Sequence, residues 1–323
     1  MTRVAAIDCG TNSLRLLVAD VPPEGPHHDL LRRMEVVRLG QGVDATGRLA
    51  PEAVERTRVV LAQYAAQARE LGATAVRMVA TSASRDAANR TDFEDVVLTT
   101  LGQLPDVVPG DEEAQLSFLG ATASLDAAVA AHGRPAPRPP YLVVDIGGGS
   151  TEFVLGDAGG VQAARSVDVG CVRLTERHLH GDPPTPDEIG RAEADIRAAL
   201  ADVVATVPVG EAATLVGLAG SVTTVAALAL DLPAYDPVAI HGSRIPVSAV
   251  RAVTAGLLTA TRQRRAAYPV MHPGRVDVIG AGSLLLRVVM DAFAVDDVVV
   301  SEHDILDGIA LRLARGPVRE GPR

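Results

Sequence analysis

The stretch YLVVDIGGGSTEFVLGD, residues 141–157, repeats a pattern that occurs near the start of the chain as RVAAIDCGTNSLRLLVAD, residues 3–20. In both stretches an apolar run ends in an Asp, a short turn of small polar residues follows, and a second apolar run begins. Asp8 corresponds to Asp145, 137 residues later. Apolar runs separated by such turn residues are typical of β-hairpins. The chain therefore encodes the same hairpin twice, which indicates two similar domains.

Length and composition agree with this interpretation. A chain of 323 residues suits two domains of roughly 150 residues each. Hydrophobic residues make up 47% and aromatic residues only 2%, so the cores are expected to consist of Val, Leu, Ala and Ile. No apolar run approaches the ~18 to 20 residues of a membrane span, and no signal-peptide pattern precedes the first strand. We expect a cytoplasmic protein that does not bind membranes.

The charge limits the class of ligand. A formal net charge of −10 argues against broad nucleic-acid binding, which needs a basic surface. It still allows a polyanion to be held locally by Arg side chains and backbone N–H groups. All 30 basic residues are Arg, and the absence of Lys excludes both a P-loop and Schiff-base chemistry.

Each half of the chain is predicted to open with three strands and to continue with alternating strands and helices, which indicates a mixed α/β sheet. The first half has strands expected at residues 4–8, 14–20, 30–40 and 75–83, and helices at 51–72, 92–101 and 112–124. After the proline-rich connection HGRPAPRPP, the second half has strands expected at residues 141–145, 151–155, 162–169 and 213–220, and helices at 186–204 and from 221. A last helix is expected at 303–315. The predicted domains are residues 1–131, completed by 302–323, and residues 132–301.

The turn in the second hairpin is suited to anion binding. Three consecutive glycines leave backbone N–H groups uncovered, as in an anion-binding nest, and a hydroxyl follows. The phosphate-binding candidates here are Gly147, Gly148, Gly149 and Ser150. Asp145 and Glu152 flank the turn with the oxygen ligands that Mg²⁺ prefers. The alternative is a glycine-rich hairpin with solvated acids, but the matching turn with Asp8, Asn12 and Ser13 favours phosphate.

Three further segments carry candidate residues. In VATSASRDAANR, Arg85 can recognise phosphate, although a capped helix with surface arginines is equally consistent. In VVPGDEEAQLSFLG, Glu113 can orient water, although acids in a first helical turn also stabilise the helix dipole. In LVGLAGSVTTVAAL, Gly220, Ser221 and Thr223 can form an anion site at a helix N-terminus. The similar segment DVIGAGSLLL is expected to serve close helix packing instead.

Histidine and cysteine offer no alternative chemistry. His178 and His180 have no third ligand at a zinc spacing. His27 and His28 are expected to be exposed. Cys9, in the first turn, is interpreted as a packing residue.

Six motifs occur in the order found in the exopolyphosphatase and guanosine pentaphosphatase family, which the chain therefore resembles over nearly its whole length. They are AIDCGTNSLRLLVAD, VATSASRDAANR, GDEEAQLSFLGA, VVDIGGGSTEFVLG, GLAGSVTTVAAL and HPGRVDVIGAGSLLL. The resemblance implies the fold of the actin, sugar kinase and chaperone ATPase superfamily: two ribonuclease H-like domains with mixed sheets flanking a central cleft. The chain looks like the short form of the family, without additional helical domains.

The resemblance also implies roles for individual residues. Glu113 is the catalytic residue that positions or activates water, and Asp145, Glu152 and Asp8 hold the metal. The residues that hold phosphates are Asn12, Ser13, Arg85, Gly147, Gly148, Gly149, Ser150, Gly220 and Ser221.

The implied activity is Mg²⁺-dependent hydrolysis of the terminal phosphoanhydride of inorganic polyphosphate, which releases orthophosphate. A monovalent cation is a further candidate cofactor, and a homodimer is the implied assembly. Three alternatives stay open: conversion of guanosine pentaphosphate to the tetraphosphate, phosphoryl transfer to or from a nucleotide, and a non-catalytic sensor of phosphate chains.

Overall fold

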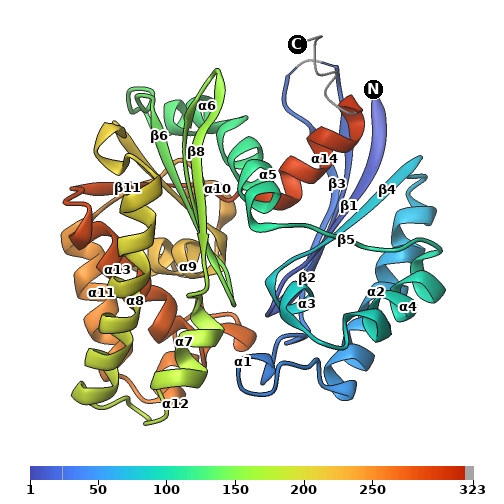
Figure 1. Ribbon diagram of the computed structural model, residues 1–323. Helices are drawn as coiled ribbons and strands as arrows, with labels where there is room; N and C mark the ends of the chain where they lie inside the picture. Colours follow the sequence, from blue (N-terminus) through green and yellow to red (C-terminus); the bar gives the residue numbers. More distant parts are fainter. Residues whose placement is uncertain (24, 317–323) are drawn as a thin grey trace. The chain divides into compact units, whose positions relative to one another are not determined.

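The computed structural model describes residues 1–23 and 25–316 (Figure 1). Its contacts divide the chain into two compact units: Met1–Ala123 with the chain from Ile305, and Ser124–Asp304. The division therefore falls before the expected boundary at residues 131/132. The reason is that helix α6 (Leu125–Ala131) belongs to the second unit, where Gly242 lies so close that a Cβ on it would be 2.5 Å from the backbone of Ala128.

The first unit is a mixed sheet with helices on both faces. Its five-stranded sheet has the order β3-β2-β1-β4-β5, in which β1, β2 and β3 are antiparallel while β1, β4 and β5 run parallel. The strands are β1 (Thr2–Cys9), β2 (Ser13–Val21), β3 (His28–Val36), β4 (Ala75–Ala80) and β5 (Asp106–Val107). The helices are α1 (Val43–Thr46), α2 (Pro51–Glu70), α3 (Ser82–Asp86), α4 (Arg90–Leu101), α5 (Gly110–Thr122) and α14 (Ile305–Arg315).

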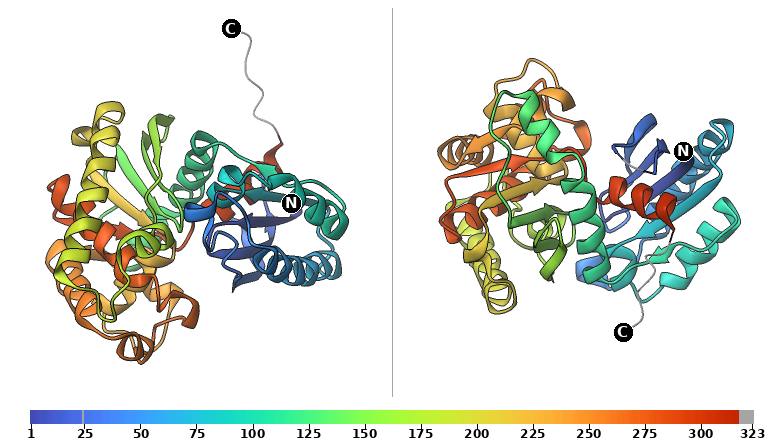
Figure 2. Two further views of the ribbon diagram at one scale, coloured as in Figure 1. Left: turned by 60° about the horizontal axis from the view of Figure 1, so that its bottom comes forward. Right: turned by 90° about the horizontal axis from the view of Figure 1, so that it is seen from above.

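Successive residues of β1 enter two different cores, which explains why its sequence is apolar throughout rather than alternating. Ala5 and Ile7 pack in a core with α2, whereas Val4 and Ala6 pack in a second core with α14. Helix α14 lies against the sheet beside α5, far from it in sequence (Figures 1 and 2). The end of the chain thus supplies one layer of the first unit.

The second unit repeats this topology. Its six-stranded sheet has the order β10-β11-β9-β6-β7-β8. In sheet order, β8, β7, β6, β9 and β11 correspond to β3, β2, β1, β4 and β5 of the first unit. Strand β10 is an additional antiparallel strand at the edge. The strands are β6 (Tyr141–Ile146), β7 (Thr151–Asp157), β8 (Gly160–Val167), β9 (Thr214–Leu218), β10 (Arg244–Pro246) and β11 (Asp297–Val300). The helices after α6 are α7 (Cys171–His178), α8 (Pro186–Thr206), α9 (Ala219–Ala229), α10 (Pro237–Ile240), α11 (Val247–Thr259), α12 (Arg262–Ala266) and α13 (Ile279–Ala292), with 3-10 turns η1 (Val209–Glu211) and η2 (Pro273–Arg275).

The hairpin duplication predicted from the sequence is confirmed, as β1–β2 in one unit and β6–β7 in the other. Thr185 caps α8 at its N-terminus and forms a full capping box with Glu188. The last helix begins at Ile305, two positions after the expected start at residue 303, and residues 317–323 of the expected terminal segment lie outside the described part of the chain. Among the helices that the structure describes, none is both long and apolar enough to span a membrane.

Candidate active site

The turn of the first hairpin is held in place by its own backbone. The Gly10 N–H donates to the Ser13 carbonyl at 3.0 Å. The Asn12 carbonyl accepts from the N–H groups of Val37 and Arg38, which follow β3. With the backbone fixed in this way, the half-buried side chains of Asn12 and Ser13 project from a rigid turn.

Asp8 is paired within the first unit by a neighbouring strand. It lies opposite Arg15 in the β1–β2 register, and the Arg15 guanidinium donates to one Asp8 carboxylate oxygen at 2.7 and 2.9 Å. Asp8 is buried, with 3% of its surface exposed. Its negative charge is therefore balanced by a protein cation.

Glu113 and Arg85, far apart in sequence, meet in the first unit. Arg85 donates from Nη1 to the Glu113 carboxylate at 3.1 Å and to the Val108 carbonyl at 3.1 Å. Glu113 is buried in the first turn of α5, with 7% of its surface exposed. Helix α3, which carries Arg85, is tied to the hairpin turn by a 2.9 Å hydrogen bond between the Ser82 and Thr11 hydroxyls.

Cys9 is a core residue at the end of β1. Burial, followed by the charge of Asp8, raises the pKa of its thiol well above the usual value. The thiol is therefore a packing group, as interpreted from the sequence.

The second hairpin has the same turn. The Gly147 N–H donates to the Ser150 carbonyl at 3.1 Å, the equivalent of the Gly10 bond. The Gly148 carbonyl in turn accepts from the first N–H groups of α7. A Cβ on Gly170 would lie 2.4 Å from that carbonyl oxygen, so only glycine allows α7 to approach this closely. The glycine turn is thus backed by a helix.

Asp145 and Glu152 form a carboxylate pair. They are direct partners in the antiparallel β6–β7 register, so their side chains lie on one face with Cβ atoms about 4.5–5.5 Å apart. Both are buried, and the Ser166 hydroxyl donates to Glu152 at 2.8 Å. Two hard oxygen donors at this spacing fit a divalent cation. Glu152 occupies the position that Arg15 has in the first hairpin.

The predicted turn at Gly220 is contacted by Arg275, a residue of η2 that the sequence reasoning missed. A Cβ on Gly220 would lie 2.4 Å from the guanidinium carbon of Arg275, so Arg275 packs flat against this glycine. Arg275 also donates to the Thr224 hydroxyl at 3.1 Å. The only available signal was the motif HPGRVDVIGAGSLLL, in which Arg275 was quoted but given no role.

Ser221 is less open than expected. A Cβ on Gly282 would lie 2.1 Å from the Ser221 hydroxyl, which also interacts with Cys171. Gly282 thus serves close helix packing, as the sequence predicted for its segment. Ser221 contributes to that contact, and its backbone N–H lies in the first turn of α9.

The candidates within each unit gather at one edge of its sheet. In the first unit β1 and β4 run parallel, so the turn at Gly10 and the residues after Ala80 share an edge. In the second unit β6, β9 and β11 run parallel, so Asp145, the Gly220 turn and the residues after Val300 share an edge. Ligand sites in such sheets lie at the carboxyl ends of the strands. In each unit, candidates far apart in sequence are thus brought to one edge of the sheet.

These features define a protein built from two ribonuclease H-like α/β units, each with a tight turn of small residues at the end of its first strand. The chain belongs to the Ppx/GppA phosphatase family, whose model matches residues 17–315. It is 52% identical over 326 aligned positions to exopolyphosphatase 2 of Mycobacterium tuberculosis, which covers 97% of this chain and 99% of the relative.

Solved structures place the chain in the same family. The fold is similar to the crystal structure of an exopolyphosphatase-like protein, with a TM-score of 0.91, 43% identity, and coverage of 97% of this chain and 99% of the other. It is also similar to the PPX-GPPA enzyme of Aquifex aeolicus, with a TM-score of 0.76, 30% identity, and coverage of 96% and 99%.

Proposed function

We propose that the protein is an exopolyphosphatase, which hydrolyses the terminal phosphoanhydride of inorganic polyphosphate and releases orthophosphate. The observation that carries the proposal is the pairing of Glu113 with Arg85 beside an anion-binding turn, in a chain that also holds the Asp145–Glu152 carboxylate pair. The full-length similarity to a relative named exopolyphosphatase 2 supports the substrate class.

In the proposed reaction, backbone N–H groups of the turns bind the non-bridging oxygens of the terminal phosphates. Glu113 orients the attacking water and accepts its proton, while Arg85 holds the carboxylate in place and offers its remaining donors to phosphate. The transition state of phosphoryl transfer is loose, so positioning and electrostatic stabilisation supply most of the catalysis. Water attacks the terminal phosphorus, the bond to the bridging oxygen breaks, and the shortened chain leaves with that oxygen.

Asp145 and Glu152 would hold Mg²⁺, which when bound neutralises charge on the phosphate oxygens. Asp8 is a weaker candidate for this role because Arg15 already balances its charge. We propose that Asp8 instead fixes Arg15 at the ligand-binding edge of the first unit.

The test is orthophosphate release from short polyphosphate, long polyphosphate and guanosine pentaphosphate in the presence of Mg²⁺. Glu113→Gln keeps the shape of the side chain but cannot accept a proton, so we expect kcat to fall at least ~100-fold. Glu112→Gln is the matched control, because Glu112 is the preceding residue of the same helical turn and pairs with Arg77 instead. Equal turnover by Glu113→Gln and Glu112→Gln would remove Glu113 from the mechanism.

Guanosine pentaphosphate is the second candidate substrate, because the family comprises both Ppx and GppA proteins. Competition between a guanosine nucleotide and polyphosphate at one site, with faster turnover of the nucleotide, would favour this activity. Tight binding of all three compounds without release of phosphate would favour a sensor.

We further propose that the enzyme uses Mg²⁺ as its cofactor, with a monovalent cation as a further candidate. We also propose that it forms a homodimer and that it is located in the cytoplasm. Support comes from the family resemblance and, for location, from the two buried free cysteines. Sedimentation equilibrium and replacement of Mg²⁺ by Mn²⁺ or Ca²⁺ test the assembly and the cofactor.

A further inference from the structure

The first turn of α9 lies directly beside the carboxylate strand of the second unit. Strand β9 ends at Leu218, the register partner of Asp145, and α9 begins at the next residue. Ala219 makes this sharp transition with a φ of 67°, a left-handed conformation that is costly for a residue other than glycine. The N-cap residue is Leu218, whose apolar side chain cannot accept a hydrogen bond from the helix N–H groups. Because this conformation is strained, contacts from elsewhere in the unit must hold the turn.

Tyr235 supplies such a contact. Its hydroxyl lies 2.7 Å from the Thr223 hydroxyl, in the first turns of α9, and 2.6 Å from a carboxylate oxygen of Glu302. Burial first, and then the charge of Glu302, raises the pKa of Tyr235 above its usual value, so the phenol keeps its proton. An ionised carboxylate can only accept, and a phenol carries one hydrogen. The phenol therefore donates to Glu302, and the Thr223 hydroxyl donates to the phenol.

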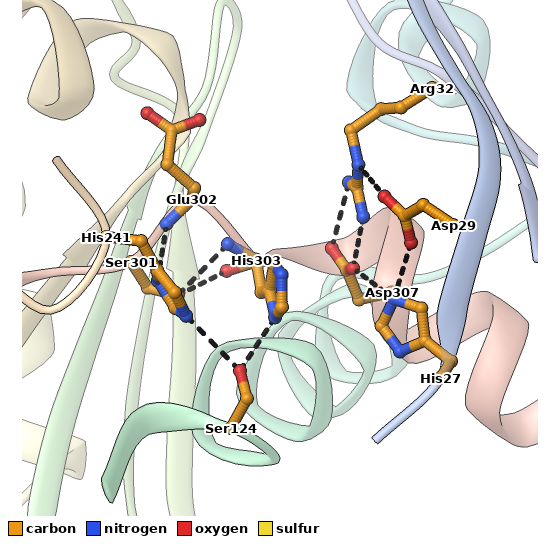
Figure 3. Close-up of polar contacts among 9 residues, drawn as sticks. All are labelled: His27, Asp29, Arg32, Ser124, His241, Ser301, Glu302, His303 and Asp307. Atoms are coloured by element: carbon orange, nitrogen blue, oxygen red, sulfur yellow. Dashed lines mark hydrogen bonds and ion pairs between the residues drawn. The ribbon is translucent and has the colours of Figure 1, made fainter. Parts of the chain in front are cut away.

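Glu302 follows the end of β11, and hydrogen bonds of the backbone fix its position. Its N–H donates to Nδ1 of His241 at 3.2 Å, and Nε2 of His241 lies 3.3 Å from the Ser124 hydroxyl (Figure 3). The preceding Ser301 N–H donates to the Gly217 carbonyl of β9. The backbone that carries this carboxylate is thus anchored beside β9, the strand that leads into the α9 turn.

We propose that Tyr235 is a positioning residue for phosphate binding, which acts through Thr223 on the first turn of α9 and uses Glu302 as its anchor. The inference rests on the proposed function and deepens it. Thr223 does not donate to phosphate in this arrangement, since its hydrogen is committed to Tyr235. Its role is to orient the N–H groups of Gly220 and Ser221.

The first turn of α9 also positions a cation, the guanidinium of Arg275. The orientation of this turn therefore affects ligand binding through the guanidinium as well as through the N–H groups. Thr224 follows Thr223 in α9, donates to the Gly220 carbonyl at 2.6 Å, and accepts from Arg275 at 3.1 Å. A rotation of the turn after loss of the Tyr235 bond would therefore move both the N–H donors and the guanidinium. Binding groups need to be held to within about 0.5 Å, so a small rotation is sufficient to weaken binding.

The test compares Tyr235→Phe, Thr223→Val and the double variant in steady-state hydrolysis of tripolyphosphate. We expect each single variant to raise KM about 2- to 10-fold, the range for one hydrogen bond, while kcat stays within about 2-fold. The double variant should match the singles rather than multiply them, because both remove the same bond. Glu302→Gln retains an acceptor for the phenol and should leave KM closer to wild type than Tyr235→Phe does.

Tyr141→Phe is the matched control. Tyr141 begins β6, at the opposite end from Asp145, and its hydroxyl donates to the Pro137 carbonyl at 3.3 Å and also interacts with Asp126. A lower melting temperature for Tyr235→Phe with unchanged KM would overturn the proposal, since the bond would then serve stability alone. If wild-type protein hydrolyses none of the substrates, the proposed function fails. Calorimetric titration of Glu113→Gln and Glu113→Gln/Tyr235→Phe with tripolyphosphate then decides the inference, which requires weaker binding by the latter.

Discussion

One position in the duplicated hairpin separates the roles of the two units at the residue scale. Opposite the strand-end Asp, the first unit has Arg15 and the second has Glu152. The Arg pairs with its Asp and cancels the charge, whereas the Glu adds a second carboxylate on the same face. Two carboxylates on one face attract a cation more strongly than an Asp that is already paired with an Arg. We therefore expect the metal to bind in the second unit, at Asp145 and Glu152.

This difference predicts distinct effects of three substitutions. Asp145→Asn and Glu152→Gln should each raise the Mg²⁺ concentration for half-maximal activity at least ~10-fold, because each removes a charged ligand. Asp8→Asn should leave that concentration within about 2-fold and lower the free energy of unfolding by about 1.5–3 kcal/mol through loss of charged hydrogen bonds. Metal titrations and urea unfolding measure the two quantities. A shift in Mg²⁺ dependence for Asp8→Asn as large as that for Glu152→Gln would contradict the assignment.

At the scale of elements, the placement of α14 depends on one close approach. A Cβ on Gly308 would lie 2.0 Å from the Leu116 carbonyl oxygen of α5. Because the obstacle is helical backbone, it cannot rotate away as a side chain does. The helix pair packs at this distance only because the contact residue is glycine.

Gly308→Ala should therefore force α14 away from α5 and destabilise the first unit by about 1–3 kcal/mol, the range for overpacking. Gly256→Ala is the matched control, since Gly256 lies in helix α11 and a Cβ there would meet nothing within 4 Å. That substitution should be neutral or stabilising by up to about 1 kcal/mol, because alanine is the better helix former. Differential scanning calorimetry of both variants provides the comparison, and equal melting temperatures would refute the packing argument.

At the scale of the whole molecule, ends of the chain meet in a buried ionic cluster within the first unit. Asp307 of α14 is fully buried and pairs with Arg32 of β3 at 2.5 Å and with His27 at 3.1 Å (Figure 3). Asp29 pairs with both basic residues from the other side. The sequence prediction that His27 is exposed is wrong, because only 5% of its side chain is accessible.

The cluster predicts that stability falls at alkaline pH. Burial by itself lowers the pKa of His27, but its bonds to Asp29 and Asp307 outweigh burial and raise that pKa to about 9. A group whose pKa is higher in the folded state stabilises the fold. For His27 this stabilisation is complete at a pH below the unfolded-state pKa of about 6.5, and it is lost as the pH rises through the folded-state pKa of about 9. We expect the free energy of unfolding to fall by on the order of 2 kcal/mol between pH 7 and pH 10.

His27→Gln removes the titrating group and should flatten this pH profile while lowering stability at pH 7. His28→Gln is the matched control, because His28 is an exposed neighbour. The measurement is urea unfolding at a series of pH values. Parallel profiles for wild type and His27→Gln would show that the ion pairs do not carry the effect.

Much of the candidate site could be predicted because its parts lie within short motifs. The turn glycines around Gly147 and the carboxylates flanking them are spaced by the hairpin itself, and a two-residue periodicity places Asp145 opposite Glu152. Arg275 and Tyr235 could not be found in this way. Arg275 reaches Thr224 across 51 residues and Tyr235 reaches Thr223 across 12, and neither stands in a pattern that predicts a contact with α9.

The sequence by itself determined the duplicated hairpin, the mixed sheets, the position of the two hairpin turns and the family, because these depend on local periodicity and on short motifs. Only the tertiary structure decided that Arg15 neutralises Asp8, that Arg85 holds Glu113, and that the first unit ends at Ala123 rather than at residue 131. The physical reason is that such pairings depend on the three-dimensional path of the chain. Coulombic attraction and close packing act over a few ångströms, whatever the separation of the residues in sequence.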